Sequence, residues 1–382
     1  MKRSIFTADH EAFRESCAAF IARHVTPHLQ EYYDHHGIDR SFWLTAGAEG
    51  FLGLEVPDEY GGSYASGDYR FNTVLFEELS KVNAAISSCY GIHADIVTPY
   101  IAKMGNAEQQ RRWLPGLASG RLLGALAMTE PGGGSDVAAL RTSAVRDGDG
   151  WVINGAKTFI TNGSSADMIL TAVRTSDRGS RGITLFVLEA TDTGFSRGRR
   201  LDKVGQQESD TAELFFTDLR VGDDRVLGEV DSGFVAMMKH LPQERLGSAV
   251  SNLAHAKAVL LETVEYARNR EAFGRAIGAF QHNKFLLAEL VTKIEVTEAY
   301  VDAAVMAHCA GELSPIDAAK AKWWSAETQN EVLDHCLQLH GGYGYMNEYR
   351  VARAWRDARV TKIWAGSNEI MKELIGRDLG FR

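Results

Sequence analysis

Cysteine is scarce and scattered in this chain. The four cysteines, Cys17, Cys89, Cys309 and Cys336, lie far apart and form no Cys-x-x-Cys pair. This spacing excludes the disulfide framework of a small secreted domain and the paired ligands of a zinc ribbon. Because most of the cysteines fall in helical apolar patterns, we expect buried free thiols in a reducing compartment. The sequence therefore favours a cytoplasmic location.

Long apolar runs and basic stripes are also missing. No apolar run approaches the roughly 18–20 residues of a membrane-spanning helix, and the opening residues MKRSIF lead into an amphipathic pattern, unlike a signal peptide. The net charge is −9, and short basic clusters such as residues 197–200 are surrounded by acidic and apolar residues. A nucleic-acid-binding protein needs a positive surface to displace counterions from phosphates. We therefore expect neither a membrane span nor a nucleic-acid partner.

Two further kinds of active site are excluded by spacing. His335 and His340 are five residues apart, which does not place both rings on one helical face, and no cysteine or carboxylate near them has zinc-site spacing. The Gly-x-Ser-x-Gly elbow of serine hydrolases does not occur. We predict no metal site and no Ser-His-Asp chemistry.

What is present divides the chain into three regions. The 382 residues are 45% hydrophobic, enough for several packed units. Apolar residues recur at three- and four-residue steps from Phe13 to Val25, and similar helical patterns cover 41–52, 69–88 and 107–119. After Leu122 the sequence changes to short β-branched and apolar runs, such as 168–173 and 183–188, that are separated by turn clusters.

Helical periodicity returns near Ser232 and covers 232–270, 280–310, 314–340 and 367–379. Helices this long usually pack as an antiparallel bundle. Several short strands with no helices between them favour antiparallel pairing. We therefore predict a multidomain α+β protein with an N-terminal helical domain (1–122), a middle antiparallel β domain (123–231) and a C-terminal helical bundle (232–382).

The most unusual segment is MTEPGGGSD at 128–136. Three consecutive glycines let the backbone approach a ligand closely and offer free N–H groups. No Gly-Lys-Ser/Thr follows, so the segment is not a P-loop, and Val137 stands where a dinucleotide fingerprint needs its third glycine. On this stretch alone a flexible turn is the favoured interpretation, and a ligand-binding loop stays open.

Two other segments allow both a functional and an ordinary interpretation. Phe159 and Thr161 point to the same side of a strand, which suits a flat ligand, although a half-buried strand explains the pair equally well. Pro242 interrupts a helical pattern and predicts a kink or a new helix start. Glu244 and Arg245 follow it, and most such neighbours are solvated surface pairs. The local pattern alone does not favour a catalytic role.

Four motifs nevertheless occur in one order: MTEPGGGSD at 128–136, FITNG at 159–163, REAFGR at 270–275 and QLHGGYG at 338–344. Together they resemble the acyl-CoA dehydrogenases over nearly the whole chain. The segments LPQER at 241–245 and NEIMKEL at 368–374 are most similar to the long-chain branch. The resemblance implies a helical domain, a β domain and a four-helix bundle, assembled as a homotetramer built from two dimers.

The resemblance also implies FAD as the cofactor, bound between the β domain and the bundle. It places Met128, Thr129 and Ser135 along the flavin ring and the substrate thioester, and it places Phe159 and Thr161 on the other side of the ring. The pyrophosphate and adenosine are expected across a subunit interface, on Arg270, Phe273, Gln281, Gln338, Gly341 and Gly342, with Ser367 and Glu369 completing that end. The acyl-CoA substrate is expected to contact Ser135, Arg245 and Ala365.

The implied reaction oxidises the α–β carbon bond of an acyl-CoA to the trans-2-enoyl-CoA. One carboxylate must remove the α-proton while a hydride leaves the β-carbon for flavin N5. Many members place this base just before the last motif, where the segment WAGSNE at 364–369 has Ala365. The long-chain and isovaleryl branches place it on the earlier helix, in a segment like LPQER. The resemblance therefore makes Glu244 the catalytic base.

An electron-transfer flavoprotein or a related acceptor is the implied electron partner, and fatty-acid or related acyl catabolism is the implied pathway. Three alternatives stay open. The chain could be an acyl-ACP dehydrogenase of lipid or siderophore biosynthesis, a flavin oxidase, or a non-catalytic acyl-CoA-binding homologue.

Overall fold

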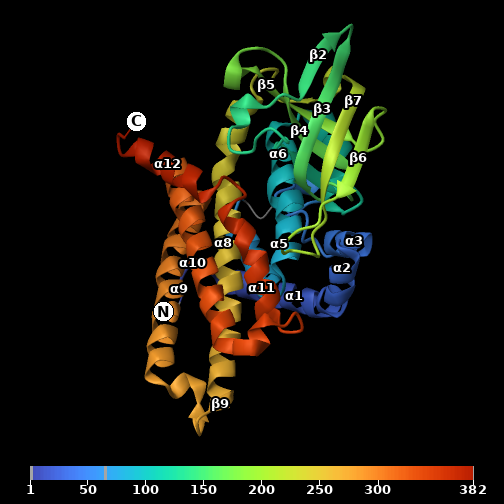
Figure 1. The fold of residues 1–382 in the computed structure, drawn as a ribbon. Coiled ribbons are helices and arrows are strands. Elements are labelled where there is room, and N and C mark those ends of the chain that lie inside the picture. Colours follow the sequence, from blue (N-terminus) through green and yellow to red (C-terminus); the bar gives the residue numbers. More distant parts are fainter. Residues whose placement is uncertain (1–2, 64–66, 382) are drawn as a thin grey trace.

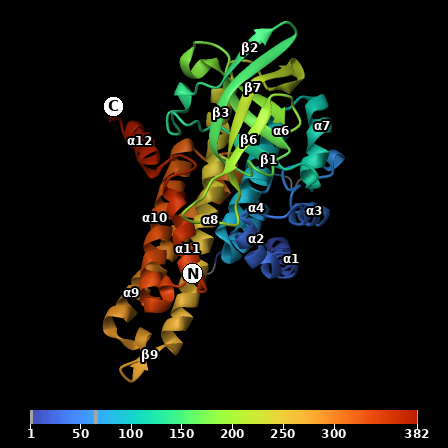
Figure 2. The ribbon, with the colours of Figure 1, turned by 45° about the vertical axis from the view of Figure 1, so that its right-hand side comes forward.

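The N-terminal region is a layer of short helices beside a long bundle (Figures 1 and 2). The computed structural model describes residues 3–63 and 67–381. The helices are α1 (Ala8–His24), α2 (Leu29–His35), α3 (Arg40–Ala48), α4 (Arg70–Val82), α5 (Ala84–Tyr90), α6 (Thr98–Met104) and α7 (Ala107–Ala118), with a π-helical segment, η3 (Gly91–Val97), joining α5 to α6.

Two of the helices expected here differ from the prediction. The pattern at 69–88 predicted one helix, but it is divided at Asn83, whose extended backbone ends α4 and whose side chain caps α5 by accepting the Ile86 N–H at 3.0 Å. The helix expected over 41–52 ends at Ala48, and Gly50 adopts φ +82° in the turn that follows. Asparagine favours helix N-caps and glycine favours left-handed backbone, so each break has a local cause.

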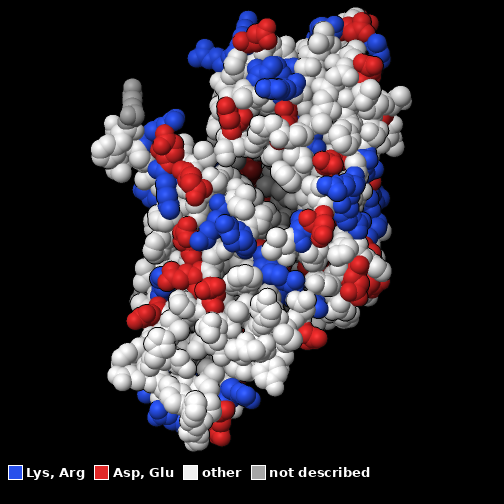
Figure 3. Space-filling view, in the orientation of Figure 1, with Lys and Arg blue, Asp and Glu red and all other residues white. Residues whose placement is uncertain are grey.

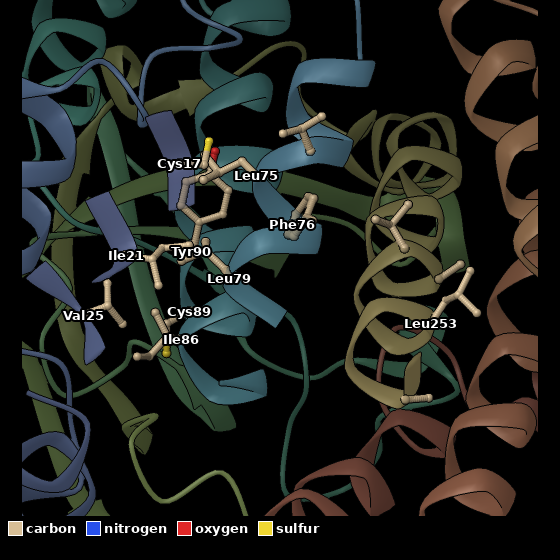
Figure 4. Close-up of a cluster of buried hydrophobic side chains, with 14 of the residues drawn as sticks. Cys17, Ile21, Val25, Leu75, Phe76, Leu79, Ile86, Cys89, Tyr90 and Leu253 are labelled. Carbon is tan, nitrogen blue, oxygen red and sulfur yellow. The ribbon is translucent and has the colours of Figure 1, made fainter. Parts of the chain in front are cut away.

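Helices α1, α4 and α5 share one apolar core with the bundle (Figure 4). Cys17 and Ile21 of α1 contribute to this core together with Leu75 and Leu79 of α4 and Leu253 of the bundle. All four cysteines are free thiols, and three of them, Cys17, Cys89 and Cys336, are buried. Burial raises the pKa of each of those three to about 12, so they are packing groups and not nucleophiles.

The middle region forms one eight-stranded sheet of order β6-β7-β3-β2-β4-β5-β8, with β1 paired to β4. The strands are β1 (Gly124–Ala127), β2 (Ser143–Asp147), β3 (Gly150–Thr161), β4 (Met168–Arg174), β5 (Ile183–Glu189), β6 (Phe195–Arg200), β7 (Thr211–Gly222) and β8 (Val226–Leu227). Most pairs are antiparallel as expected, but β1 runs parallel to β4, and β2 meets β4 in parallel at Ser143 and Arg174. The long connection through β2 and β3 lets the chain return in the same direction, which a parallel pair requires.

The C-terminal region is the long bundle at the left of Figure 1. Its elements are α8 (Gly233–Asn269), the hairpin β9 (Glu271–Ala272) and β10 (Arg275–Ala276), α9 (Gln281–Cys309), α10 (Pro315–His340), α11 (Arg350–Ala358) and α12 (Asn368–Asp378). None of the described helices is long and apolar enough to cross a membrane.

Helix α8 runs from Gly233 to Asn269 with Pro242 inside it, so the new helix start that the sequence offered as one possibility does not occur. The proline removes one backbone donor, but α8 packs along α4, α9 and α10, and tertiary packing of this extent outweighs one lost hydrogen bond. Helix α11 was not predicted, because its nine residues are too few to establish a periodic pattern.

Polar contacts fasten the sheet to the helices on two sides. Arg40 of α3 forms an ion pair with Asp167 at 2.7 Å. The Asn162 amide donates to the carbonyl of Cys89 at 3.1 Å. On the bundle side, the backbone N–H of Gln206 donates to the buried carboxyl of Asp357, and the Gln206 amide donates to the Asp357 carbonyl at 3.2 Å. These contacts fix the edges of the space between the three regions.

Gly47→Ala tests the close packing of α3 against the turn after α7. A Cβ at Gly47 would lie 2.3 Å from the backbone carbon of Ser119, so we expect destabilisation by roughly 2 kcal/mol from overpacking. Alanine normally stabilises a helix by up to about 1 kcal/mol over glycine. Gly376→Ala in α12, where nothing lies within 4 Å, should show that ordinary gain. Urea unfolding midpoints compare the two, and equal midpoints would contradict the packing.

Candidate active site

A cavity of about 230 Å³ lies where the three regions meet, and Figure 3 shows a hollow in the surface between the sheet and the bundle. Its walls come from α4, α5 and η3, from β1 and β3 with the residues after β1, from the loop between β6 and β7, from α8 and α10, and from the segment between α11 and α12. The lining includes six of the residues singled out in the sequence: Met128, Thr129, Phe159, Thr161, Glu244 and Ala365.

Glu244 is buried on α8, and it is not the solvated surface residue that its local pattern favours. The hydroxyl of Tyr100 on α6 donates to its Oε1 at 3.2 Å. Burial raises the pKa of Glu244 to about 7, the hydrogen bond from Tyr100 lowers this pKa, the charge of Asp95 raises it, and Arg245 lowers it. A carboxyl group with this pKa is a much stronger base than an exposed glutamate.

A second carboxyl group, Asp95 of η3, lines the same cavity. Burial, with the charge of Glu55, raises its pKa to about 7. Three side chains donate to it: Tyr69 at 3.1 Å, and Asn72 and Gln243 at 3.2 Å each. Asp95 is therefore held within a network of protein donors.

The loop before α12 has strained backbone at the cavity wall. Ala365 adopts φ +52°, which is unfavourable for a residue with a Cβ, and Gly366 follows at φ +84°. Buried Lys322 of α10 fixes this conformation by donating to the Gly366 carbonyl at 2.6 Å. Among the described residues, the Ala365 N–H has no hydrogen-bond acceptor. Burial, with the charge of Arg245, lowers the pKa of Lys322 to about 7.

Arg245 is also buried, and its Nε has no hydrogen-bond partner within the described part of the chain. Burial lowers the pKa of Arg245. Arg245 does not line the cavity, so its predicted contact with substrate is not visible in this arrangement.

The β-domain wall is anchored by a buried lysine. Lys157 of β3 donates to the Met128 carbonyl at 3.0 Å and pairs with Glu130 at 2.8 Å. Glu130 also accepts the backbone N–H groups of Arg141 and Thr142, at 2.6 and 2.8 Å. The residues from the end of β1 to Glu130 are therefore held in place by hydrogen bonds, and they form an ordered wall and not a flexible turn. Burial lowers the pKa of Lys157 to about 8, against the opposing effect of Glu130.

Phe159 and Thr161 both line the cavity, but not as neighbours on a regular strand. The register of β3 shifts between Lys157 and Ile160, and Phe159 adopts φ +59°. Its ring is 68% exposed, which is unusual for phenylalanine and typical of a surface that binds a ligand. The hydroxyls of Thr129 and Thr161 hydrogen-bond to no described residue, so two polar groups are free at this wall.

Three other predicted residues lie beyond the cavity lining. Ser135 is in the exposed loop after Glu130, where a Glu130–Gly133 bridge closes a tight turn. Ser367 caps α12 by accepting the Ile370 N–H at 3.4 Å, and Glu369 is exposed in the first turn of that helix. The last two follow the Ala365 loop directly, so they stand near the cavity.

The remaining predicted residues gather at the far end of the bundle, away from the sheet (Figures 1 and 2). The Arg270 guanidinium lies 5.7 Å from the centre of the Tyr343 ring, which brings the hairpin and the glycine loop together. Phe273, at the hairpin tip, is 96% exposed. The group consists of exposed residues and is completed by Gln281, Gln338, Gly341 and Gly342. One chain therefore does not unite this group with the cavity.

Sequence reasoning missed Asp95, Tyr100, Lys157 and Lys322. Asp95 and Tyr100 fall in apolar helical surroundings that resemble any core helix. Lys157 gave a usable signal, because it is a lone charge within a strand of apolar and hydroxyl residues. No group of three or more His, Cys, Asp or Glu side chains within the described ranges could hold a metal ion.

Family models match almost the entire chain. The acyl-CoA dehydrogenase N-terminal domain matches residues 7–121, the middle domain 125–219 and the C-terminal domain 231–380. The chain belongs to the acyl-CoA dehydrogenase family. It is therefore an oxidoreductase whose family acts on acyl-CoA thioesters with FAD.

Similar proteins agree with this assignment. The long-chain specific acyl-CoA dehydrogenase, mitochondrial, of Sus scrofa is 43% identical over 99% of this chain and 88% of its own length. The isovaleryl-CoA dehydrogenase, mitochondrial, of Solanum tuberosum is 35% identical over 98% of this chain and 91% of its own length. The acyl-CoA dehydrogenase structure from Geobacillus kaustophilus has a TM-score of 0.96 at 44% identity and covers 98% of both chains.

Two further solved structures concern redox partners and cofactors. One comes from work on the electron transferring flavoprotein of Acidaminococcus fermentans, with a TM-score of 0.94, 35% identity and 99% coverage of both chains. The other is an acyl-CoA dehydrogenase complexed with FAD from Bacillus anthracis, with a TM-score of 0.92 and 28% identity over 99% of this chain and 70% of that one.

The cavity of this chain fits the flavin of FAD. A flat ring with an apolar face and polar edge atoms needs apolar contacts together with free donors. Met128 and the exposed ring of Phe159 provide the contacts, and the free hydroxyls of Thr129 and Thr161 provide the donors.

Lys157→Met tests whether a buried cation holds the β-domain wall. Removing the charge leaves the Glu130 carboxylate and the Met128 carbonyl without their partner, so we expect a loss of about 3 kcal/mol in stability and a lower flavin content. Lys320→Met removes an exposed lysine and should change neither. Urea unfolding and the ratio of flavin to protein absorbance measure both effects. A Lys157→Met protein as stable as Lys320→Met would contradict this function of the lysine.

Proposed function

We propose that the chain oxidises the α–β bond of an acyl-CoA to the trans-2-enoyl-CoA, with Glu244 as the base that removes the α-proton. One observation carries the proposal. Of the described residues that line the cavity, only Asp95 and Glu244 have carboxyl groups, and Asp95 is occupied by three donors. Glu244 accepts one hydrogen bond, through Oε1. Ala365, at the position used by other members, has no proton acceptor.

The α-proton of a thioester is a weak acid, so both ends of the transfer need support. At the acceptor end, burial raises the pKa of Glu244 to about 7. At the donor end, the free N–H of Ala365 is suited to hydrogen-bond the thioester carbonyl as negative charge develops on it. This backbone donor is independent of the side chain, so an alanine can fill the position. When bound, FAD supplies the hydride acceptor.

The flavin-binding roles of the cavity residues are part of this proposal. Met128, Thr129, Phe159 and Thr161 would hold the ring, since they line the cavity and offer apolar contacts and free hydroxyls. Ser367 and Glu369 would bind the same cofactor next to the Ala365 loop. Ser135 would contact the substrate from the exposed loop. Arg245 would contact it from its buried position behind the cavity lining.

Glu244→Gln should keep FAD and lose at least about 10²-fold in turnover, because the amide cannot accept a proton. Dye-coupled acyl-CoA oxidation measures turnover, and visible absorbance measures the flavin. Glu265→Gln changes an exposed glutamate on the same helix and should retain full activity. Substantial turnover by a flavin-loaded Glu244→Gln enzyme would show that Glu244 is not the base.

The double variant Glu244→Gln/Ala365→Glu tests whether a carboxylate at position 365 can replace the one lost at position 244. Both positions line one cavity, so a carboxylate at position 365 should restore part of the turnover. The gain is limited by the cost of a glutamate at φ +52°. Ala365→Gln in the same background separates a restored base from a mere change of side-chain volume.

We further propose that the distal group (Arg270, Phe273, Gln281, Gln338, Gly341 and Gly342) binds the pyrophosphate and adenosine of a partner subunit's FAD in a homotetramer. The group is exposed, lies far from the cavity of its own chain, and includes a phenylalanine that is 96% exposed. Figure 3 shows few charged residues over the lower part of the bundle, as expected for a surface that pairs with another subunit.

Mixed oligomers test this sharing. Phe273→Asp and Glu244→Gln should each be inactive alone, because one lacks the distal contact and the other lacks the base. Co-expressed with different tags and isolated by both tags, the two chains should regain activity, since one site would combine Glu244 of one chain with Phe273 of the other. Inactive mixed oligomers of full flavin content, or a fully active Phe273→Asp protein, would contradict the shared site.

Four wider assignments are proposed with the same function. The electron acceptor is an electron-transfer flavoprotein or a related protein, and the pathway is fatty-acid or similar acyl catabolism. Four free cysteines support a cytoplasmic location, which cell fractionation would test. The domains are 1–122, 123–231 and 232–382, supported by the end of α7 at Ala118 and the start of α8 at Gly233.

A further inference from the structure

Tyr100 is a buried side chain whose hydroxyl contacts the proposed base. It lies on α6 and is 1% exposed. Its hydroxyl donates to Glu244 Oε1 at 3.2 Å and has no other hydrogen-bond partner in the described ranges. A buried tyrosine hydroxyl usually finds a hydrogen-bond partner, and Tyr90 uses the backbone carbonyl of Phe51, at 3.0 Å. Tyr100 instead donates to a carboxyl group that lines the cavity, as Tyr69 does to Asp95 at 3.1 Å.

Two features hold the Tyr100 ring in place. The π-helical segment η3 ends directly before α6, and Thr98 closes the junction by donating to the His93 carbonyl at 2.8 Å. On the other side, the Tyr100 ring packs on His240 with centroids 4.3 Å apart and planes 31° from parallel. His240 lies one helical turn before Glu244 on α8, so the Tyr100 ring packs on the same helix that carries Glu244.

We propose that Tyr100 is a positioning residue for Glu244: it holds Oε1 of the carboxylate and leaves Oε2 to accept the α-proton. This inference rests on the proposed function of Glu244. No described residue donates to Oε2, whereas Oε1 is engaged. A glutamate carboxylate at the end of three rotatable bonds is oriented by one fixed hydrogen bond, and catalytic geometry depends on such orientation.

The same hydrogen bond also changes the pH at which Glu244 ionises. A donor to the charged form of a carboxyl group lowers its pKa, so Tyr100 opposes the burial and the Asp95 charge that raise the pKa of Glu244. Two other titratable groups adjoin the pair, because His240 packs on the Tyr100 ring and Arg245 follows Glu244 on α8. The next charges out are Lys103 of α6, which acts on His240, Glu55, which acts on Asp95, and Lys322 of α10, which interacts with Arg245. Each is left unchanged by removal of the Tyr100 hydroxyl.

Tyr100→Phe removes the hydroxyl and keeps the ring. When an enzyme uses a carboxylate as its base, kcat/KM rises with pH as the carboxyl group ionises. The rising part of this pH profile, the acid limb, therefore reports the pKa of the carboxyl group. Without the donor this pKa rises, and we expect the acid limb to move to higher pH by about one unit. We also expect kcat at the plateau to fall several-fold while the flavin content stays the same.

Tyr90→Phe is the matched control, because it removes a buried tyrosine hydroxyl that does not contact Glu244. Its acid limb should coincide with that of the wild type. If Tyr100→Phe fails to fold, 3-fluorotyrosine at position 100 provides the test: a stronger donor should move the limb to lower pH. A flavin-loaded Tyr100 variant with an unshifted limb overturns the proposal.

The two single variants and their combination separate this inference from the proposed function. If Glu244→Gln is inactive and Tyr100→Phe leaves the limb in place, only the positioning by Tyr100 is wrong. If Glu244→Gln is active, the proposed base is wrong whatever Tyr100 does. In the Glu244→Gln background, Tyr100→Phe should cause no further loss of residual turnover.

Discussion

A carboxyl group that acts as a base near neutral pH must lose most of its water and still face its substrate. In this chain that constraint applies to Glu244, the base we propose, and both the N-terminal helices and the bundle contribute to meeting it. Helix α8 carries the side chain, α6 supplies its hydrogen-bond donor, and η3 places a second carboxyl group nearby. The strained loop at Ala365 forms another part of the wall of the same cavity. The burial of Glu244 is thus a property of the assembled domains and not of its own helix.

Two buried lysines hold the walls of this cavity. Lys157 donates to the Met128 carbonyl in the β domain, and Lys322 donates to the Gly366 carbonyl before α12. In each case a cation stabilises irregular backbone that regular hydrogen bonding does not satisfy. Burial lowers the pKa of both lysines, to about 8 and about 7, which shows the cost of placing charge there. Such an arrangement suits a site that must keep one shape before any ligand arrives.

The fold class and the order of the domains could be predicted because long amphipathic helices and short apolar strands have different periods. The mixed sheet was not foreseen, since the parallel pairing of β1 and β4 depends on a connection of about 40 residues that has no local signal. The unbroken α8 shows that packing overrides the helix start that Pro242 could have caused. Six predicted site residues line the cavity together, and the distal group does not join them in one chain. Tyr100 and Asp95 could not be found from the sequence, because their importance comes from contacts with α8: Glu244 is 144 residues from Tyr100, and Gln243 is 148 residues from Asp95.

Hydrogen exchange at the α-carbon tests, without the redox step, whether Glu244 removes the α-proton. An acyl-CoA analogue with sulfur in place of the β-carbon has acidic α-hydrogens but no β-hydride to transfer. In deuterated water the flavin-loaded wild type should exchange these hydrogens, as followed by NMR, and flavin-loaded Glu244→Gln should bind the analogue without exchanging them. Exchange at equal rates in the two proteins would contradict the account.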